Sequence, residues 1–474
     1  MASYSSEYVF SAPAYLGILP NGNIRTEPEL FKQANEIVTA GVLSIKNELK
    51  EIDYPMIVSL LFNAFTERKF GPRIALGNGY GFDRIYSDSG GLQIITRGMT
   101  ITPELKRQVY AVQSKTDLAM CFDHIPVRAE SAGHRQSTLN KTFHFEDFEK
   151  CAIETAENIK EQIETFIKLG CKTKAFFIVQ GNTLDDMMLW FKIATDVIPW
   201  DYWERIQGIA IGGACMGTGQ LEDIEKLIAY GRLKEEFDPH YVRNHLHILG
   251  VGSINRLYPL VILRNTGFIG PEDHVSYDSS TLSMAYIYGT FQDANGGFIK
   301  SSPLWEDTFK FYYNKVGMIL KQFGFTQSEL DEFYPYMVSD MLCHKKVYAK
   351  DENDRLRLAS HCIKCLANIF QIKEFTHSMY DMNLRWDTDT SPIGMLKNVK
   401  TVDDFNRWKS QYGHAVPSQR ITRKGNSLET HAGSLKQNFT DEELALMKGK
   451  YSERKPGIGK PKKFTKIDSW FNEV

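Results

Sequence analysis

Short apolar runs alternate with longer amphipathic stretches up to about residue 290, and this alternation constrains the fold more than any other feature of the chain. Strands that alternate with helices are typical of a parallel sheet, because parallel neighbours need a long crossover connection. Seven or eight such units over about 250–300 residues favour a closed (β/α)8 TIM barrel with insertions over an open sheet. The expected strands are 57–62, 73–76, a run ending at 88, 117–122, 175–179, 207–211, 246–249 and the region 269–277, and the expected helices include 145–169, 184–197 and 221–229.

Nearly every expected strand ends in glycines or polar side chains. Active sites of TIM barrels form at the C-terminal ends of the strands, so a ring of such ends fits a barrel. A doubly wound sheet would concentrate these residues at one switch point instead. The ends are Gly77-Asn78-Gly79, Asp88-Ser89-Gly90-Gly91, Asp123-His124, Gln180-Gly181, Gly212-Gly213, Gly250-Val251-Gly252 and Asp278-Ser279-Ser280.

Asp88 stands directly after an apolar run and is followed by a hydroxyl and two glycines. A strand that ends in this way presents the carboxylate to a cavity, while the glycines let a ligand approach the backbone closely. A single Asp after a strand is more often a helix N-cap, and a Gly-Gly pair is more often a turn. Asp88, Asp123, Gln180 and Asp278 end four different strands, however, and four such placements on one rim predict a reaction centre.

Five segments resemble, in the same order along the chain, motifs of the tRNA-guanine transglycosylase superfamily. The resemblance covers roughly residues 70–290 and is closest to the DNA-modifying branch of that superfamily. It implies a pentosyltransferase with a TIM-barrel fold. The segments are Ser87-Asp-Ser-Gly-Gly-Leu-Gln93, Phe177-Ile-Val-Gln-Gly181, Gly208-Ile-Ala-Ile-Gly-Gly213, Leu249-Gly-Val-Gly252 and Tyr277-Asp-Ser-Ser-Thr-Leu-Ser-Met-Ala285.

The resemblance implies the roles of two carboxylates. Asp278 would be the nucleophile that attacks C1′ of the nucleotide, and Asp88 would be the general acid and base. Exchange of a base with retention at the sugar requires two displacements through a covalent intermediate, as in retaining glycosidases. A positioned carboxyl group then protonates the leaving base and deprotonates the incoming one.

The resemblance also implies a base-binding set. Asp123 would accept hydrogen bonds from guanine N1–H and the exocyclic amine, while Gln180 and the backbone of Gly212 and Gly213 would donate to the O6 and N7 side. The glycines after Asp88 would form a wall for the flat base. The expected substrate-binding residues are Ser89, Gly90, Asp123, Gln180, Gly212 and Gly213.

A pair of cysteines resembles part of the zinc motif of the superfamily, Cys-x-Cys-x2-Cys with a distant His. Here Ser360 replaces the first cysteine of the motif. A Cys-x2-Cys pair near further Cys and His residues is a zinc signal, although two half-buried cysteines on one helix give the same spacing. The expected structural Zn²⁺ ligands are Cys343, Cys362, Cys365 and His377, with His361 as an alternative to Cys343.

Three regions follow from these patterns: a transglycosylase barrel at 1–340, a helical zinc-binding subdomain at 341–415 and a basic C-terminal tail at 416–474. The chain carries a formal net charge of −2, yet residues 420–466 hold 12 Lys or Arg against 5 Asp or Glu. Such a run either contacts phosphates or is a solvated flexible tail.

The expected substrate is DNA, into which a preQ0-like 7-deazaguanine replaces guanine. Some members of the superfamily act on tRNA in queuosine synthesis, and others modify DNA in phages and bacteria. The chain lacks the Pro-Thr-Arg and Ala-Arg-Asn-Gly segments of the bacterial tRNA enzymes and a recognisable archaeal-type RNA-binding domain. A DNA enzyme would have to flip the target nucleotide out of the duplex. The alternatives are a tRNA-guanine transglycosylase, a non-catalytic barrel subunit that binds nucleic acid, and an unrelated barrel glycosidase; homodimer formation stays open.

The compartment expected from the sequence is the cytoplasm, or the host cytoplasm for a viral protein. The chain has 7 scattered cysteines, no secretory signal at its start and no apolar stretch near the length of a membrane span. Free thiols or metal ligands are therefore expected rather than disulfides, and no membrane partner is expected.

Overall fold

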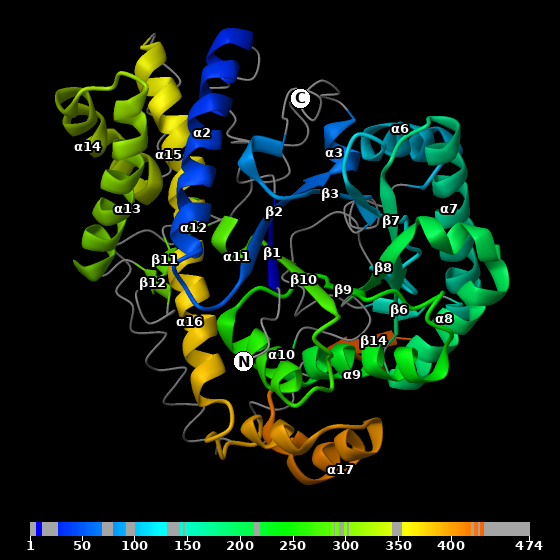
Figure 1. Ribbon diagram of the computed structural model, residues 1–474. Coiled ribbons are helices and arrows are strands. Elements are labelled where there is room, and N and C mark those ends of the chain that lie inside the picture. Colours follow the sequence, from blue (N-terminus) through cyan, green and yellow to red (C-terminus); the bar gives the residue numbers. More distant parts are fainter. Residues whose placement is uncertain are drawn as a thin grey trace.

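Eight parallel strands close into a barrel in the order β1-β10-β9-β8-β7-β4-β3-β2. The structure is a computed structural model that describes residues 6–11, 27–68, 79–91, 100–129, 143–145, 147–181, 183–212, 219–283, 285–288, 290–292, 298–300, 303–343, 353–418, 421–424 and 427–430. The predicted TIM barrel is confirmed (Figure 1). Its strands are β1 (Ser6–Ser11), β2 (Met56–Asn63), β3 (Ile85–Asp88), β4 (Leu118–Met120), β7 (Lys174–Val179), β8 (Ile206–Ile211), β9 (His245–Ile248) and β10 (His274–Ser279).

Helices connect successive strands and lie outside the barrel (Figure 1). Several begin at a side-chain cap: Thr102 accepts a hydrogen bond from the N–H of Leu105, and Thr183 forms a reciprocal capping box with Asp186. Such caps satisfy backbone donors that the first helical turn leaves free. The barrel helices are α2 (Pro28–Leu49), α3 (Ala64–Glu67), α6 (Pro103–Gln113), α7 (Phe148–Lys168), α8 (Leu184–Val197), α9 (Gln220–Glu236), α10 (Ile254–Asn265) and α11 (Ser280–Ser283).

The first strand of the barrel was not predicted. β1 contains only the short apolar run Tyr8-Val9-Phe10, and the charged Glu7 directly precedes it, although the Glu7 side chain is fully buried. The predicted strand 73–76 lies outside the described residues, and the region expected at 269–277 becomes extended only from His274. Residues 270–273 instead form a turn in which Asp273 accepts from the backbone N–H of Gly270.

The C-terminal helices pack directly on the barrel. Their buried side chains belong to the same contiguous core as those of the barrel, and the predicted boundary at residue 340 falls inside α14. A Cβ atom on Gly41 of α2 would lie 2.5 Å from Leu366 of α15, so glycine permits this close helix approach. The remaining helices are α12 (Ala285–Tyr288), α13 (Pro303–Gln322), α14 (Gln327–Cys343), α15 (Asp354–Phe370), α16 (Ile372–Arg385) and α17 (Val402–Tyr412), and a small sheet joins β11 (Thr290–Gln292) to β12 (Phe298–Lys300).

Part of the predicted basic tail forms a hairpin. β13 (Ile421–Lys424) pairs with β14 (Ser427–Thr430), and β14 pairs with β6 (Phe143–Phe145), which pairs with β5 (Val127–Ala129). The sequence signal for this hairpin is Gly425-Asn426 between two short β-type runs. Because β5 and β6 belong to the connection after β4, the pairing fixes the start of the basic region beside that connection.

Within the described part of the chain, the search for a helix long and apolar enough to cross a membrane finds none.

Candidate active site

The C-terminal ends of four parallel strands bring together the four residues singled out in the sequence. Asp88 ends β3, Asp123 follows β4, Gln180 follows β7 and Asp278 lies near the end of β10. The groups interact: Gln180 is hydrogen-bonded to Asp123, and the charges of Asp123 and Asp278 both raise the pKa of Asp88. The mouth of the barrel is therefore an acidic, partly buried site built from residues up to 190 positions apart in sequence.

Asp88 is held by the neighbouring strand β2. Asn63 is its register partner on β2 and donates from Nδ2 to Asp88 Oδ2 at 3.2 Å. Asn63 Oδ1 caps α3 by accepting from the N–H of Thr66 at 3.0 Å, which fixes the amide orientation. Gly90 has a φ of +82°, and a Cβ there would lie 2.4 Å from that of Phe65, so the turn after Asp88 needs glycine.

The environment of Asp88 raises its pKa to about 7. Burial is the largest cause, and the negative charge of Asp123 is the next; the backbone N–H groups of Gly90 and Ser89 act in the opposite direction. A carboxyl group that titrates near neutral pH can both give and take a proton, which is the requirement for general acid–base catalysis.

Asp123 and Gln180 form a buried pair. Gln180 donates from Nε2 to Asp123 Oδ2 at 2.6 Å, and burial raises the pKa of Asp123 although this bond and the charge of His124 lower it. Gln180 Oε1 is buried and has no hydrogen-bond partner among the residues that the structure describes. A buried acceptor without a partner costs about 1–3 kcal/mol, so this oxygen is a place for a donor of a ligand.

The structure adds to one predicted role in base binding and changes another. Gln180 commits one of its two amide N–H groups to Asp123 and leaves its oxygen unpaired, so it offers an acceptor besides the predicted donor. The N–H of Gly212 continues the sheet ladder by donating to the oxygen of Val179 at 3.0 Å and is not available to a base. Gly212 instead leaves room for Gln180, because a Cβ there would lie 2.4 Å from Gln180 Nε2. Gly213 lies outside the described residues.

Ser89 and Gly91 lie at the same strand end. Ser89 is fully buried, and its hydroxyl accepts from the N–H of Gly91 at 3.4 Å, which is an ordinary turn contact. A Cβ on Gly91 would lie 3.0 Å from Asp123 Oδ1, so the backbone after Asp88 closely approaches the buried pair.

Asp278 is held through one of its two carboxylate oxygens. Oδ1 accepts from the backbone N–H of Gly250 at 2.9 Å and lies 3.2 Å from Nε2 of His247. No described residue forms a hydrogen bond with Oδ2, and the side chain is 16% exposed. One oxygen is thus fixed while the other is accessible.

Glu7 lies at the centre of a polar barrel interior that the sequence did not predict. Its carboxylate accepts from Ser59, from Arg84 at 3.0 Å and from Tyr86 at 2.9 Å, and it is hydrogen-bonded to His274. Burial acts to raise the pKa of Glu7, but the His274 bond and the Arg84 charge outweigh it and lower the pKa overall. TIM-barrel interiors are usually filled by branched apolar side chains, so a buried ion pair here is unusual.

The alternation of polar residues along the strands was the sequence signal for this polar interior. Inward-facing positions alternate along a strand, and polar residues occupy every second position in Arg84-x-Tyr86-x-Asp88, His245-x-His247 and His274-x-Ser276-x-Asp278. The strand register confirms that His247 and Ser276 are partners, as are His245 and His274.

Glu7, His245 and His274 are the one group of described residues with three potential metal-ligand atoms within 4.8 Å of one another. Arg84 Nη1, however, lies 3.0 Å from Glu7 Oε2 and 3.2 Å from His274 Nε2. A guanidinium already supplies the positive charge at this position, so the contacts favour an ion-pair network over a metal centre.

The predicted zinc ligands are not assembled by the described residues. Cys362 and Cys365 are fully buried on α15, and their side chains and His377 of α16 do not all lie within 4.8 Å of one another. Burial, then the neighbouring Cys365, raise the pKa of Cys362 well above its usual value. His361 Nε2 lies 3.8 Å from Cys365 Sγ. The side chain of Cys343 lies outside the described residues, so the complete set stays a prediction.

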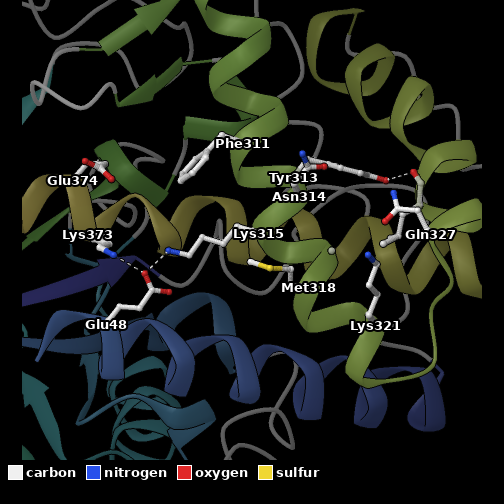
Figure 2. A pocket seen from close by; sticks show the side chains of 12 residues that line it. Glu48, Phe311, Tyr313, Asn314, Lys315, Met318, Lys321, Gln327, Lys373 and Glu374 are labelled. Atoms are coloured by element: carbon white, nitrogen blue, oxygen red, sulfur yellow. Dashed lines mark hydrogen bonds and ion pairs between the residues drawn. The ribbon is translucent and has the colours of Figure 1, made fainter. Parts of the chain in front are cut away.

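A separate hollow of about 580 Å³ lies between α2, α13, α14 and α16 (Figure 2). Glu48 on its wall forms ion pairs with both Lys315 at 2.7 Å and Lys373 at 2.9 Å. None of the strand-end carboxylates lines this hollow, and the candidate active site is the barrel mouth.

No family model and no curated protein matches the chain. The fold and the site together define a TIM barrel with three carboxylates and one buried amide at the C-terminal ends of its strands.

Proposed function

We propose that this barrel is a transglycosylase that exchanges guanine in DNA for a preQ0-like 7-deazaguanine through a covalent aspartyl–nucleotide intermediate. The observation that carries the proposal is the difference between two carboxyl groups of one site. Asp88 has a pKa of about 7, while Asp278 has one oxygen held by two neighbours and one oxygen accessible. Two carboxyl groups in such different surroundings suit an acid–base catalyst and a nucleophile.

In the first displacement, Asp278 attacks C1′ while the bond from C1′ to the base nitrogen breaks. The new bond joins C1′ to the Asp278 carboxylate, and protonated Asp88 gives its proton to the leaving guanine. In the second displacement, Asp88 takes a proton from the incoming base, whose nitrogen attacks C1′ and releases Asp278. Both carboxyl groups return to their starting states, and the sugar keeps its configuration.

The buried pair supplies acceptors for the base. Guanine presents N1–H and an exocyclic amine on one edge, and Asp123 and the unpaired Gln180 Oε1 match these donors. A 7-deazaguanine carries the same N1–H and amine and differs at position 7. A site that recognises the shared edge accepts both the leaving and the incoming base.

The start of the basic region supports a polyanionic substrate. Leu221, at the first turn of α9, donates its N–H to the oxygen of Pro417 at 3.0 Å, and Ser418 is hydrogen-bonded to Glu222. Because α9 follows β8, its N-terminus lies at the mouth side of the barrel. The basic run 420–466 starts from this point, and its lysines and arginines suit phosphate contacts.

Exchange of labelled guanine into DNA and into tRNA, measured in parallel, tests the proposal. We expect label in DNA and an adduct between protein and nucleic acid that survives denaturation. Asp278→Ala should abolish both, whereas the exposed control Asp53→Ala should change neither. Label in tRNA alone would assign the chain to the tRNA-modifying enzymes, and the absence of both label and adduct would favour a binding subunit.

A further inference from the structure

A chain of hydrogen bonds runs through the barrel interior and ends on Asp278. His247 Nε2 lies 3.2 Å from Asp278 Oδ1, and its Nδ1 lies 2.8 Å from the Ser276 hydroxyl. The same hydroxyl lies 3.0 Å from His245 Nε2, and His245 Nδ1 lies 3.5 Å from the amide nitrogen of Gln207. Both imidazole rings and Ser276 are buried.

With both imidazole rings neutral, donor and acceptor counting gives this chain one direction. An ionised carboxylate only accepts, so His247 must carry its proton on Nε2. Nδ1 of a neutral His247 then accepts the single hydroxyl hydrogen of Ser276. The Ser276 oxygen in turn accepts from His245 Nε2, and His245 Nδ1 accepts from the Gln207 amide, which is a donor. His245, Ser276 and His247 then each donate once toward Asp278 and accept once from behind.

We propose that this relay locks His247 in its neutral Nε2–H form and makes His247 a positioning residue that holds Asp278 Oδ1, so that Oδ2 is the attacking oxygen. The catalytic part of this inference rests on the proposed transglycosylase reaction, but the protonation pattern does not. In the covalent intermediate, Oδ2 forms the bond to C1′, and Oδ1 becomes the carbonyl oxygen of the ester. The donors on Oδ1, His247 and the N–H of Gly250, remain in place through both displacements.

The surroundings of the relay favour neutral rings. The centre of the His247 ring lies 5.7 Å from that of Tyr86 and 5.9 Å from that of Phe176. Burial, then the charge of His274, then that of Arg84, place the pKa of His245 well below its usual value. Glu7 already contacts Arg84 and His274, so its negative charge is stabilised without a further positive charge on the relay. The titratable groups around the relay include Glu7 and Tyr8 on β1, Arg84 directly before β3, Tyr86 and Asp88 on β3, and His274 and Asp278 on β10.

Tyr86 offers the competing arrangement. Its hydroxyl donates to Glu7 at 2.9 Å and also interacts with Ser276, which could turn the Ser276 hydrogen away from His247. His247 would then be a doubly protonated imidazolium that donates both to Ser276 and to Asp278. The two arrangements differ by one proton on His247 and are distinguishable by measurement.

Nitrogen NMR of the full-length protein labelled in the histidine rings tests the relay without any substrate. The spectrum has 12 histidines to assign, and His247→Gln and His245→Gln identify the two signals by their loss. At pH 7.5 we expect both rings to be neutral with the proton on Nε2. A doubly protonated His247, or a proton on its Nδ1 alone, overturns the inference whether or not the protein exchanges bases.

The positioning role of His247 is tested by the single-turnover rate at which the covalent adduct forms. His247→Phe keeps a ring but loses the donor, and we expect the rate to fall about ten- to a hundredfold with little change in the KM for the nucleic acid. His247→Gln retains an amide donor and should recover most of that rate. Equal losses in the two variants, or a loss confined to KM, would contradict the positioning role. If the NMR pattern holds and no adduct forms in the unaltered protein, the proposed function fails while the relay stands.

Discussion

Replacing Asp88 with asparagine should stabilise the protein at alkaline pH and not at acid pH. The carboxyl group titrates at about 7 in the folded protein and at about 3.8 when unfolded, because burial and the charges of Asp123 and Asp278 oppose ionisation. Between these two values only the folded state holds the proton, so stability falls as the pH rises from 4 to 7 and then stays level. The asparagine side chain has the same shape and never ionises.

The size of this stabilisation follows from the difference between the folded and unfolded pKa values of Asp88. A difference of this size corresponds to about 4 kcal/mol at full effect. Asp88 is partly exposed, and Asp123 and Asp278 share in the repulsion, so we expect Asp88→Asn to raise the free energy of unfolding by about 2–4 kcal/mol at pH 8.5. The same variant should lose base exchange, because it removes the proton donor.

Urea unfolding at pH 4.5, 6, 7 and 8.5 provides the measurement. The stability difference between Asp88→Asn and the unaltered protein should grow through this series and reach its plateau above pH 7. Asp53→Asn, at an exposed position, is the matched control and should show no such growth. A difference that is the same at pH 4.5 and 8.5, or a loss of stability at pH 8.5, would refute the electrostatic account of Asp88.

Three further changes test other parts of the structure. Gly212→Ala places a Cβ 2.4 Å from the Gln180 amide, so it should weaken base binding and cost about 1–3 kcal/mol of stability, measured by base titration and urea unfolding. Glu7→Gln leaves the partly exposed Arg84 without its buried partner and should cost about 1–3 kcal/mol at pH 7. The pKa of Glu7 is lowered in the folded protein. The difference in free energy of unfolding between Glu7→Gln and the unaltered protein should therefore narrow as the pH falls below about 4.5, and acid unfolding curves measure it. Finally, glutamine at three lysines of the basic region should reduce the slope of DNA affinity against salt by about 2–3, and an unchanged slope would exclude phosphate contacts by Lys460, Lys462 and Lys463.

The sequence by itself determined the barrel and the positions of its polar strand ends. Asp88, Asp123 and Asp278 were found because each follows an apolar run, and the parallel topology places all such ends at one mouth. The start and end of α8 were also predicted to the residue, since a capping Thr183 and an apolar periodicity are local signals. The hairpin of β13 and β14 was missed, although its turn signal in the sequence is equally local.

Only the tertiary structure decided the chemistry of those residues. The raised pKa of Asp88 depends on burial and on carboxylates 35 and 190 positions away, which no local pattern encodes. The pairing of Gln180 with Asp123 likewise leaves the Gln180 oxygen as a buried acceptor, and the distant Glu7 and His274 meet only because β1 closes the barrel against β10. Secondary structure follows from interactions within a few residues, whereas charge state and hydrogen-bond direction follow from groups that closure of the barrel brings into contact.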